Sequence, residues 1–298
     1  MKRLLPFLML LALCLLTSCE QPYLVDSHPE SESESDADPN VILRVQGFDV
    51  VPFEGVDTRA DERVEDVCSR LNFVVYIGET KVKSIAQKRG DSDFGTVALA
   101  LPEGDYTYAV IAHSSEGSAT VTSLDKISFK NNRVTDTFSY CDELTVGEEN
   151  VTEDISLRRT TAMFRLKLSE PLPEQVTQLK FYYTGGSSTL SALTGYGSVK
   201  SKQTVVLDVQ PGQQVFEVYT IPWAEEGVLK MTISAMDAAG NVLQERIFTD
   251  VPVHRNRITA CTCTFSTGTQ ESPGEGNFQF HLDSEWEGED EYVVPGGE

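Results

Sequence analysis

Six cysteines and four histidines are the residues of this chain with the greatest capacity for metal, redox or nucleophilic chemistry. Cys261 and Cys263 form a Cys-x-Cys pair, a spacing that can bind a metal, but no cluster of further cysteines and histidines stands near it in the sequence. Because side chains alternate along a strand, both thiols would share one face, where their sulfurs are poorly placed to bond to each other. We therefore predict two buried free thiols here, with no metal site and no cofactor.

Recognised catalytic patterns are missing from the sequence. It has no Gly-x-Ser-x-Gly elbow, no His-Glu-x-x-His motif, no phosphate-binding Gly-Lys loop and no dinucleotide glycine pattern. His113 precedes two serines that it could activate, but its place at the end of a predicted strand favours a structural role, and His254 falls in a predicted turn. Acid pairs such as Glu225 and Glu226 are expected to form a solvated face in so acidic a chain. The protein is predicted not to be an enzyme, with no catalytic residues.

The charge balance is strongly acidic, because 46 Asp and Glu against 24 Lys and Arg give a net charge of −22 over 298 residues. This balance disfavours binding to nucleic acid, whose phosphate backbone is held by Lys and Arg that displace its counterions. It equally disfavours docking on an anionic membrane through a basic surface. With 40% hydrophobic residues the chain can still bury a core, which excludes global disorder.

The N-terminus follows the pattern of an export signal. Lys2 and Arg3 precede an apolar run over residues 4–16, about the length of a signal-peptide core and too short to span a membrane and remain there. The run ends in LTSC, with Cys19 last, and this ending resembles the bacterial lipoprotein signal. The resemblance implies that residues 1–18 are a signal peptide and that Cys19 is acylated, so that several buried chains hold the protein at the cell outer membrane. An ordinary secretory peptide followed by an unrelated cysteine is the alternative.

The segment after this cysteine has the composition of a linker. Residues 20–40 alternate serine and acid with proline and contain almost no apolar side chain, so they cannot bury enough surface to fold. We predict a lipidated, solvated tether over residues 19–40. A sorting tag for the cell surface is a weaker alternative, because the acids are concentrated from Glu30 onward. A calcium site at Asp36 and Asp38 is weaker still, since the loop spacing and glycine of an EF-hand are missing.

From residue 41 onward the sequence predicts strands throughout. Apolar residues recur with period two or in short runs rich in Val, Ile, Thr, Tyr and Phe, and turn signals such as Pro-Glu-Gly-Asp separate them. No segment repeats apolar residues at helical spacing over several turns. The predicted strands include residues 41–51, 71–77, 96–101, 106–112, 151–157, 164–168, 179–183, 205–209, 215–220, 229–235, 258–265 and 277–282.

These strands divide into two groups, each the size of one sandwich. A boundary near residues 147–150 separates them, and many short strands with regular turns favour β-sandwiches. We therefore predict an all-β protein with an N-terminal β-sandwich over residues 41–147 and a C-terminal β-sandwich over 148–266. Residues 267–298 are predicted to be a linker with a C-terminal strand and an acidic tail.

Two further cysteines fit an exported protein. An exported chain meets an oxidising compartment, which permits disulfides. Cys68 precedes the first central strand of the N-terminal sandwich and Cys141 lies at the end of that sandwich. A bridge between them would stabilise the fold by about 4 kcal/mol in the loop-entropy description. Cys68 and Cys141 are therefore a possible disulfide.

Several segments of the body occur in an order that is typical of a known family. They are residues 93–106 (DFGTVALALPEGDY), 109–113, Cys68 before 71–77, Cys141 with the three residues that follow it, 159–168 (RTTAMFRLKL), 181–188 (FYYTGGSS), 194–197 (TGYG) and 255–259 (RNRIT). Behind the lipoprotein signal, this order resembles the FimB/Mfa2 family of fimbrial anchor lipoproteins of Bacteroidetes, over roughly residues 41–290. The resemblance implies two tandem transthyretin-like sandwiches and a role in fimbriae, as an anchor or minor subunit, rather than catalysis.

The resemblance also implies how subunits would join. In shaft subunits of such fimbriae a protease cuts after an arginine and removes the first strand, which opens a groove for a neighbour's strand. An anchor subunit keeps its lipid and its own first strand. Arg59 is a possible processing site, or else an exposed arginine in an acidic loop, and the strand 277–282 is either a donor strand or one that closes its own domain. The implied partners are other fimbrial subunits, together with outer-membrane lipid through Cys19.

An alternative function belongs to a different class. A lipoprotein at the cell surface could bind glycans for nutrient capture, with aromatic side chains as stacking platforms for sugar rings. Only Trp223 and Trp286 are available as large stacking faces. This alternative predicts binding to a polysaccharide that depends on those two residues.

Overall fold

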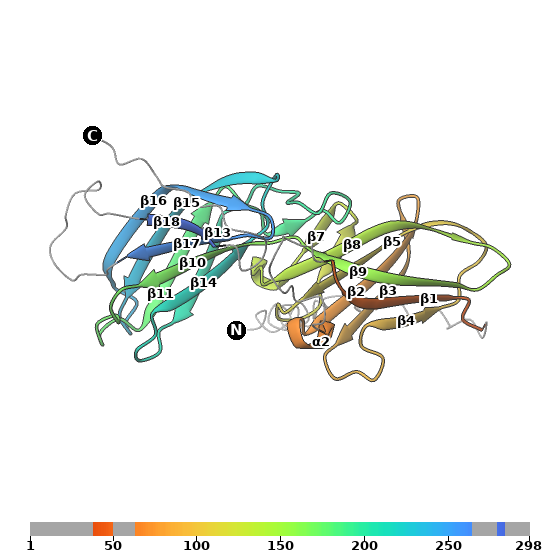
Figure 1. The fold of residues 1–298 in the computed structure, drawn as a ribbon, viewed down its shortest axis with the longest axis horizontal. Coiled ribbons are helices and arrows are strands. Elements are labelled where there is room, and N and C mark those ends of the chain that lie inside the picture. The colour runs from red at the N-terminus through yellow and green to blue at the C-terminus, as the bar shows by residue number, and fades with distance from the viewer. Residues whose placement is uncertain (1–37, 50–62, 264–278, 284–298) are drawn as a thin grey trace, which may run out of the picture. The chain divides into compact units, whose positions relative to one another are not determined.

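The computed structural model describes residues 38–49, 63–263 and 279–283, and the structural statements below concern these residues. Nearly all their regular elements are strands, which confirms the predicted all-β fold class (Figure 1). The helical elements are one turn of α-helix, α2 (Val64–Val67), and a 3-10 turn over Lys130–Asn132. The strands are β1 (Val41–Phe48), β2 (Arg70–Ile77), β3 (Thr80–Lys88), β4 (Thr96–Leu99), β5 (Gly104–His113), β6 (Thr120–Ser123), β7 (Lys126–Ser128), β8 (Thr137–Val146), β9 (Val151–Arg159), β10 (Ala162–Leu168), β11 (Gln178–Thr184), β12 (Thr189–Leu190), β13 (Gln203–Asp208), β14 (Val215–Thr220), β15 (Glu226–Met236), β16 (Val242–His254), β17 (Ile258–Cys263) and β18 (Gln279–Asp283).

The first sandwich is built from one sheet that folds over on itself. Its strand order is β3-β2-β5-β8-β9-β1-β4. Apolar residues at alternate positions of β1, β4 and β9 pack against those of β2, β5 and β8 in a single core. This core explains the alternating pattern in the sequence, because each of these strands buries one face. Buried Gln87 at the end of β3 helps to close the sandwich, since its amide donates to the carbonyl oxygens of Asp93 and Thr96 and its Oε1 accepts from the N–H of Gly95.

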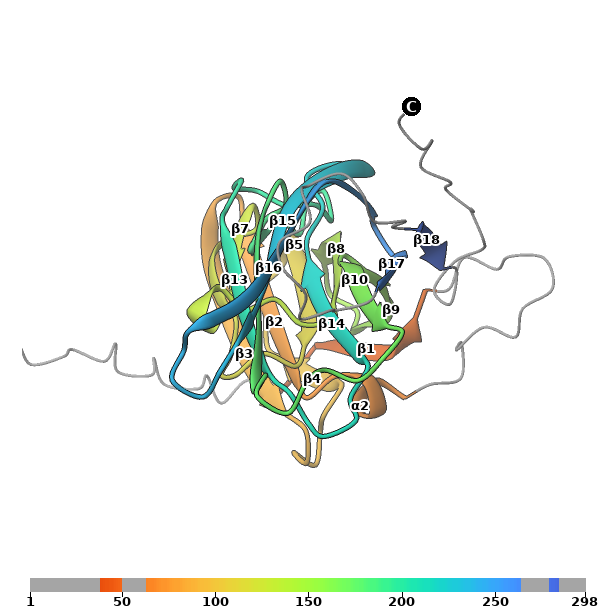
Figure 2. The same cartoon turned by 90° about the vertical axis from the view of Figure 1, so that its left-hand side faces the viewer.

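The second sandwich has two separate four-stranded sheets. Their orders are β14-β10-β17-β18 and β13-β11-β15-β16, and Figure 2 shows them as two layers. Most strand pairs are antiparallel, but β10 and β17 run parallel, with Met163 opposite Ile258. Aromatic side chains fill the core between the layers, and the ring of Phe164 lies 6.5 Å from that of Phe181 and 6.4 Å from that of Phe248. The two tandem sandwiches predicted from the sequence are therefore present.

The boundary between the two sandwiches differs from the predicted one at 147/148. Strand β9 (Val151–Arg159) follows that boundary, yet it pairs in parallel with β1 and contributes Ile155 and Leu157 to the first core. The second core begins at Ala162. The sequence places the boundary too early because the turn signal at 147–150 connects two strands of one sheet, β8 and β9.

A third apolar cluster joins the two sandwiches. It contains side chains of β2, β5 and the β6–β7 hairpin together with Leu190, Ala192 and Ile221 from the second sandwich. The backbone also crosses the junction, because β12 pairs antiparallel with β7. Beside this cluster, Arg159 donates two hydrogen bonds to the carboxylate of Asp136, at 2.9 and 3.0 Å, and a third to Asn256.

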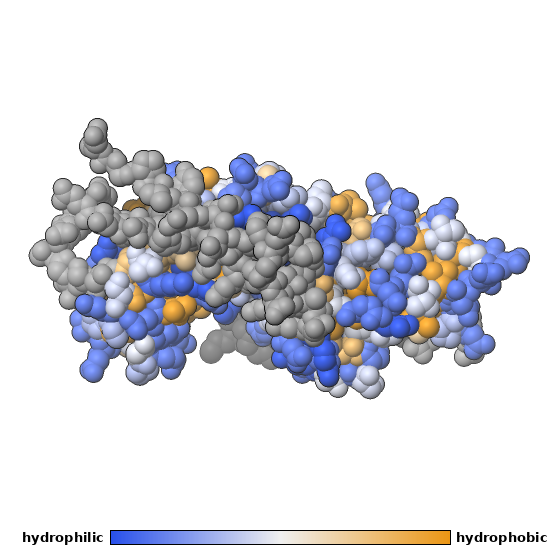
Figure 3. All heavy atoms as spheres, in the orientation of Figure 1, coloured by the Kyte–Doolittle hydropathy of each residue, from blue (hydrophilic) through white to orange (hydrophobic). Residues whose placement is uncertain are grey.

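Polar and charged side chains cover much of the described surface, as expected from the composition (Figure 3). On the face drawn in Figure 3 it is largely hydrophilic, and its apolar areas are separate from one another. Among the described residues, no helix has the length and apolar character needed to cross a bilayer.

Candidate functional site

Strand β1 is an inner strand of the first sheet, between β9 and the edge strand β4, although it is the first described strand of the chain. It pairs antiparallel with β4, from Val41 opposite Leu99 to Arg44 opposite Thr96. On its other side it pairs in parallel with β9 over almost its whole length. The first half of β1, from Val41 to Val45, is thus hydrogen-bonded on both sides, so β1 is a strand inserted between two others rather than an edge strand.

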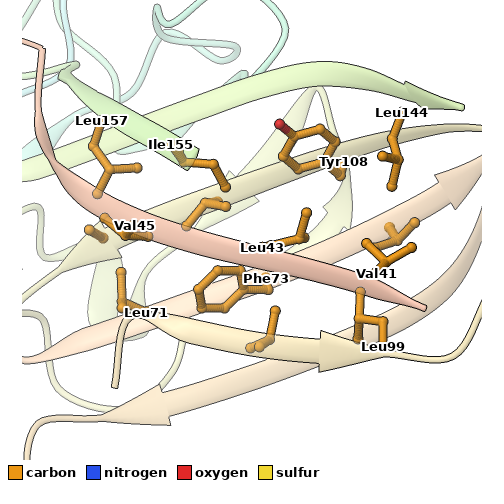
Figure 4. Packing of buried hydrophobic residues seen from close by; sticks show 14 of the residues in the cluster. Val41, Leu43, Val45, Leu71, Phe73, Leu99, Tyr108, Leu144, Ile155 and Leu157 are labelled. Atoms are coloured by element: carbon orange, nitrogen blue, oxygen red, sulfur yellow. The ribbon is translucent and has the colours of Figure 1, made fainter. Parts of the chain in front are cut away.

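The inward face of β1 fills the first core. Val41 and Leu43 have no exposed side-chain area, and Val45 is nearly buried. In Figure 4 these three side chains project from β1 towards residues of the facing strands, among them Phe73 and Tyr108. Removal of β1 would therefore open a row of apolar pockets at alternate positions, lined on either side by unpaired backbone groups of β4 and β9.

Polar contacts fix the register of β1 at both of its ends. The side chain of Asn40 donates to the carbonyl of Leu101 at 2.7 Å and accepts from its N–H at 2.9 Å. On the outward face, Gln46 donates to the carboxylate of Asp154 at 2.9 Å. Beyond the last residue of β1, Asp49 accepts a hydrogen bond from Arg158 at 2.7 Å. These contacts specify one alignment on a strand whose apolar pattern alone would permit a slip of two residues.

A second strand position lies at the C-terminal end of the described chain. Strand β18 (Gln279–Asp283) pairs antiparallel with β17, with Thr262 opposite Gln279 and Ile258 opposite Asp283. It is the outermost strand of its sheet. The predicted strand 277–282 is thus seated on the edge of its own domain in this structure.

Cys261 and Cys263 belong to β17, the strand with which β18 pairs. Both are free and buried, as predicted, and both point into the second core. The hydrogen bond between the two thiols and their burial raise the pKa of Cys261, while the same hydrogen bond lowers the pKa of Cys263. They are packing residues with little access to reagents.

The possible disulfide between Cys68 and Cys141 is not formed, because both residues are free thiols. Cys68 is buried in the first core, whereas Cys141 lies opposite Ala109 and packs against the junction cluster. The two clusters lie on opposite faces of the sheet formed by β2, β5 and β8, and Cys68 itself precedes β2, so the two thiols belong to different apolar clusters. Burial raises the pKa of Cys68, and burial with the nearby Asp142 raises that of Cys141 to about 11.

His113 and His254 have structural positions. His113 is fully buried at the end of β5, where its Nδ1 accepts the N–H of Ser115 at 3.1 Å and its Nε2 faces the Asn72 side-chain oxygen at 3.2 Å. Both ring nitrogens are occupied, which leaves none to activate a serine, and burial lowers the pKa of His113 to about 4. His254 is the last residue of β16, and its carbonyl accepts the N–H of Arg257 at 3.2 Å in the turn that follows.

The remaining predicted site residues divide into two groups. Trp223 is among the residues that the structure describes, and it is half-exposed. The ammonium of Lys200 lies 5.5 Å from its ring centroid. Cys19, Arg59 and Trp286 lie outside the described residues. Within the described ranges, no three His, Cys, Asp and Glu side chains gather in a group that could hold a metal ion.

Comparison with solved structures places the fold. A candidate adhesin from Bacteroides ovatus has a TM-score of 0.50 at 12% identity, with 83% of this chain and 94% of that chain covered. The fimbrial anchor protein Mfa2 from Porphyromonas gingivalis has a TM-score of 0.44 at 8% identity, over 83% and 96% of the two chains. The tip fimbrial protein Mfa3 of the same organism, with a C-terminal truncation, has a TM-score of 0.42 at 10% identity, over 83% and 99%. The matched structures thus include an anchor protein of the kind that the sequence resembles.

Sequence comparison gives the family. No curated protein matches the chain. Residues 54–295, which include most of both sandwiches, match the family described as Family of unknown function (DUF6562). This chain is therefore a member of that family.

Proposed function

We propose that this protein is a non-enzymatic fimbrial anchor or minor subunit, held at the outer membrane by acylated Cys19 and joined to other subunits by β-strand complementation. The observation that carries the proposal is the seat of β1, which combines backbone pairing on both sides with three buried apolar side chains. The fimbrial and adhesin proteins with this fold support a location at the cell surface.

The chain order makes β1 separable from the rest of the sandwich. Everything that follows β1 is connected to it only through residues 50–62, which contain Arg59. A cut after Arg59 would leave β1 attached to the body by hydrogen bonds and apolar contacts alone. Its departure would open the place between β4 and β9 to a neighbour's strand, and it would take the segment with Cys19 along. An uncut chain keeps both its anchor and its own β1, as a subunit at the base requires.

The C-terminal strand supplies a candidate donor. Residues 264–278 connect β17 to β18, and this connection is longer than the roughly two to five residues that join most antiparallel neighbours. A connection of that length lets β18 cover its own sheet edge or reach a second subunit. Main-chain hydrogen bonds would provide affinity in either place, since β-augmentation does not depend on a particular sequence.

The anchor is tested by fractionation and mass spectrometry of cells that produce the full chain. The wild type should be found in the outer-membrane fraction with a mature N-terminus at Cys19 and the mass of its acyl chains. Cys19→Ala should lose the acyl mass and leave the membrane, whereas the matched control Cys14→Ala should behave as the wild type. A wild-type chain without acyl mass, or a Cys19→Ala variant that stays on the membrane, would refute the anchor. A mature chain that begins at Ala60 would instead place the protein in the shaft.

Strand complementation is tested separately by exchange of β1. A specific protease site is introduced within residues 56–61 of the full chain, the chain is cut there, and a labelled peptide of residues 39–49 is added in excess. The peptide should replace β1 and remain bound through gel filtration, whereas a peptide with Leu43→Asp should not, because it buries a carboxylate. Equal retention of the two peptides, or of neither, would contradict the proposed groove.

A further inference from the structure

Two segments that are far apart in the sequence meet at the surface of the second sandwich. The loop of residues 193–200 carries Tyr196, and the turn after β16 carries Arg255. The guanidinium carbon of Arg255 lies 4.6 Å from the centroid of the Tyr196 ring, within the range of a cation–π contact. Gly195 packs on the same guanidinium, because a Cβ at this position would lie 3.0 Å from an Arg255 nitrogen.

The same loop takes part in a second pair of this kind, with a residue that follows β14. Lys200, at its end, places its ammonium 5.5 Å from the centroid of the Trp223 ring. Trp223 is 41% exposed, so part of the indole remains available to solvent. The backbone N–H of Gly197 donates to the carbonyl of Pro222 at 2.8 Å, which holds the segment beside Trp223 against the loop. The loop of residues 193–200 therefore contributes one member to each of two cation–aromatic pairs, Tyr196 to the first and Lys200 to the second.

Several other cations of the described chain are paired with a carboxylate. Arg44, Arg158, Arg159, Arg165 and Lys130 each have a carboxylate within 4 Å. In the described part of the chain no carboxylate lies that close to Arg255 or Lys200, although acids outnumber bases by 46 to 24. A guanidinium stacked on a ring keeps its N–H edges in the plane, where they can bind a carboxylate or sulfate.

The loop is rigid enough to present these groups in one arrangement. A Cβ at Gly197 would lie 2.3 Å from the Cβ of Ser187, so the backbones are in close contact there. Ser187 also forms backbone bridges with Lys200 and Ile221, which fixes both sides of the loop. A preorganised site loses little conformational entropy when a ligand binds.

We propose that Tyr196, Lys200, Trp223 and Arg255 form a binding site for an acidic polysaccharide. Its carboxylate or sulfate groups bind Arg255 and Lys200, and the apolar face of a sugar ring stacks on the exposed part of Trp223. A polymer with a charge on each repeat matches two cation–aromatic pairs that share the loop of residues 193–200. The site goes beyond the proposed anchoring function and does not depend on it, because neither β1 nor Cys19 takes part.

The test uses the full chain with Trp286→Phe, so that Trp223 is the remaining tryptophan of the two in the sequence. Chondroitin sulfate and polygalacturonate serve as acidic probes and dextran as the neutral probe, and calorimetry and tryptophan fluorescence are recorded at 0.15 M salt. At least one acidic probe should bind and change the fluorescence, dextran should not, and binding should weaken at higher salt because exposed charges are screened.

Variants of Arg255 and Lys200 test whether binding takes place at this site. Arg255→Gln and Lys200→Gln should each weaken binding about tenfold, which corresponds to loss of one charge-assisted contact. The matched controls Lys180→Gln and Tyr182→Ala, on the outer face of β11, should bind within about twofold of the wild type. Urea midpoints verify that each variant is folded.

Three results would overturn the proposal. They are failure of both acidic probes, binding of dextran equal to that of the acids, and unchanged binding in folded Arg255→Gln and Lys200→Gln. The last result would mean that the two cations only hold the loop in place. None of these results bears on the membrane fractionation of Cys19→Ala, so this site and the anchor fail or succeed independently.

Discussion

Truncation of Leu43 to alanine measures how firmly β1 is held in its place. The Leu43 side chain is fully buried in the first core, in the middle of a strand that is paired on both sides (Figure 4). Leu→Ala substitutions at buried sites cost about 2–5 kcal/mol, because transfer energy is lost and a cavity remains. We expect a value near 4 kcal/mol here, since ladders on both sides of β1 prevent the backbone from collapsing into the cavity.

The next residue along the strand provides the matched control. Arg44 points outward, its side chain is 45% exposed, and its Nε lies 3.6 Å from the carboxylate of Asp154. Exposed ion pairs contribute about 0–1 kcal/mol, so Arg44→Ala should cost no more than that. The two variants therefore remove side chains from one strand with expected costs that differ by about 3 kcal/mol.

The assay is urea unfolding of the full chain, followed by circular dichroism for both sandwiches and by tryptophan fluorescence for the second one, which contains Trp223. Leu43→Ala should lower the free energy of unfolding of the first sandwich, with the slope against urea unchanged. Equal losses in Leu43→Ala and Arg44→Ala would refute the reasoning, because they would mean that β1 does not occupy the core in solution.

Three further predictions rest on single residues. Because the pKa of His113 falls from about 6.5 in the unfolded chain to about 4 when buried, His113 should lower stability as the pH falls from 6.5 towards 4, by about 3 kcal/mol, and His113→Gln should flatten this part of a urea-midpoint profile. Gly186→Ala should cost about 1–3 kcal/mol in urea unfolding, because its Cβ would lie 2.0 Å from the Thr220 hydroxyl, and Thr220→Ala in the same chain should recover part of that loss. Since Cys68 and Cys141 are free thiols, dithiothreitol should leave the urea midpoint unchanged, and a lower midpoint with the reductant would indicate a disulfide.

Strands that bury one face could be predicted closely from the sequence. The predicted strand 215–220 has the bounds of β14, and the prediction 179–183 lies within β11. In both, apolar side chains alternate with polar ones because one face lies on the core and the other in solvent. The alternation is a direct consequence of burial, so it can be recognised without knowledge of the partner strands.

Two edge strands that lack a regular apolar face could not be predicted in the same way. Strand β3 reads TKVKSIAQK and is exposed along nearly its whole length, so no periodic apolar face marks it. Its lysines protect this edge of the sheet against pairing with other chains. The same lysines give β3 a polar sequence in place of the alternating apolar pattern by which a strand is recognised. Strand β16 is also an edge strand and mixes charges and a proline with its apolar residues. Such strands are specified by the neighbour to which they bond rather than by their own composition.

The site predictions differ in a similar way. The two thiols at Cys261 and Cys263 follow from local alternation, and they are buried free thiols as predicted. A bridge from Cys68 to Cys141 depends on which face of the sheet each residue occupies, and the distance along the sequence does not contain that information. The contact of Arg255 with Tyr196 is likewise non-local. The segments 194–197 and 255–259 could each be recognised in the sequence, but their contact could not.

The position of β1 has a mechanical consequence for a chain anchored at Cys19. If Cys19 is acylated as proposed, tension on the lipid would enter the described residues near Asn40 and Val41, where β1 begins. Hydrogen bonds of an antiparallel ladder lie perpendicular to the strands and those of a parallel ladder are slanted but evenly spaced. A pull along β1 therefore loads the bonds to β4 and β9 together, whereas a strand at a sheet edge that is pulled sideways loses its bonds one at a time. A strand inserted between two others is the arrangement that an anchored subunit needs, and the same arrangement leaves a complete groove when the strand is removed.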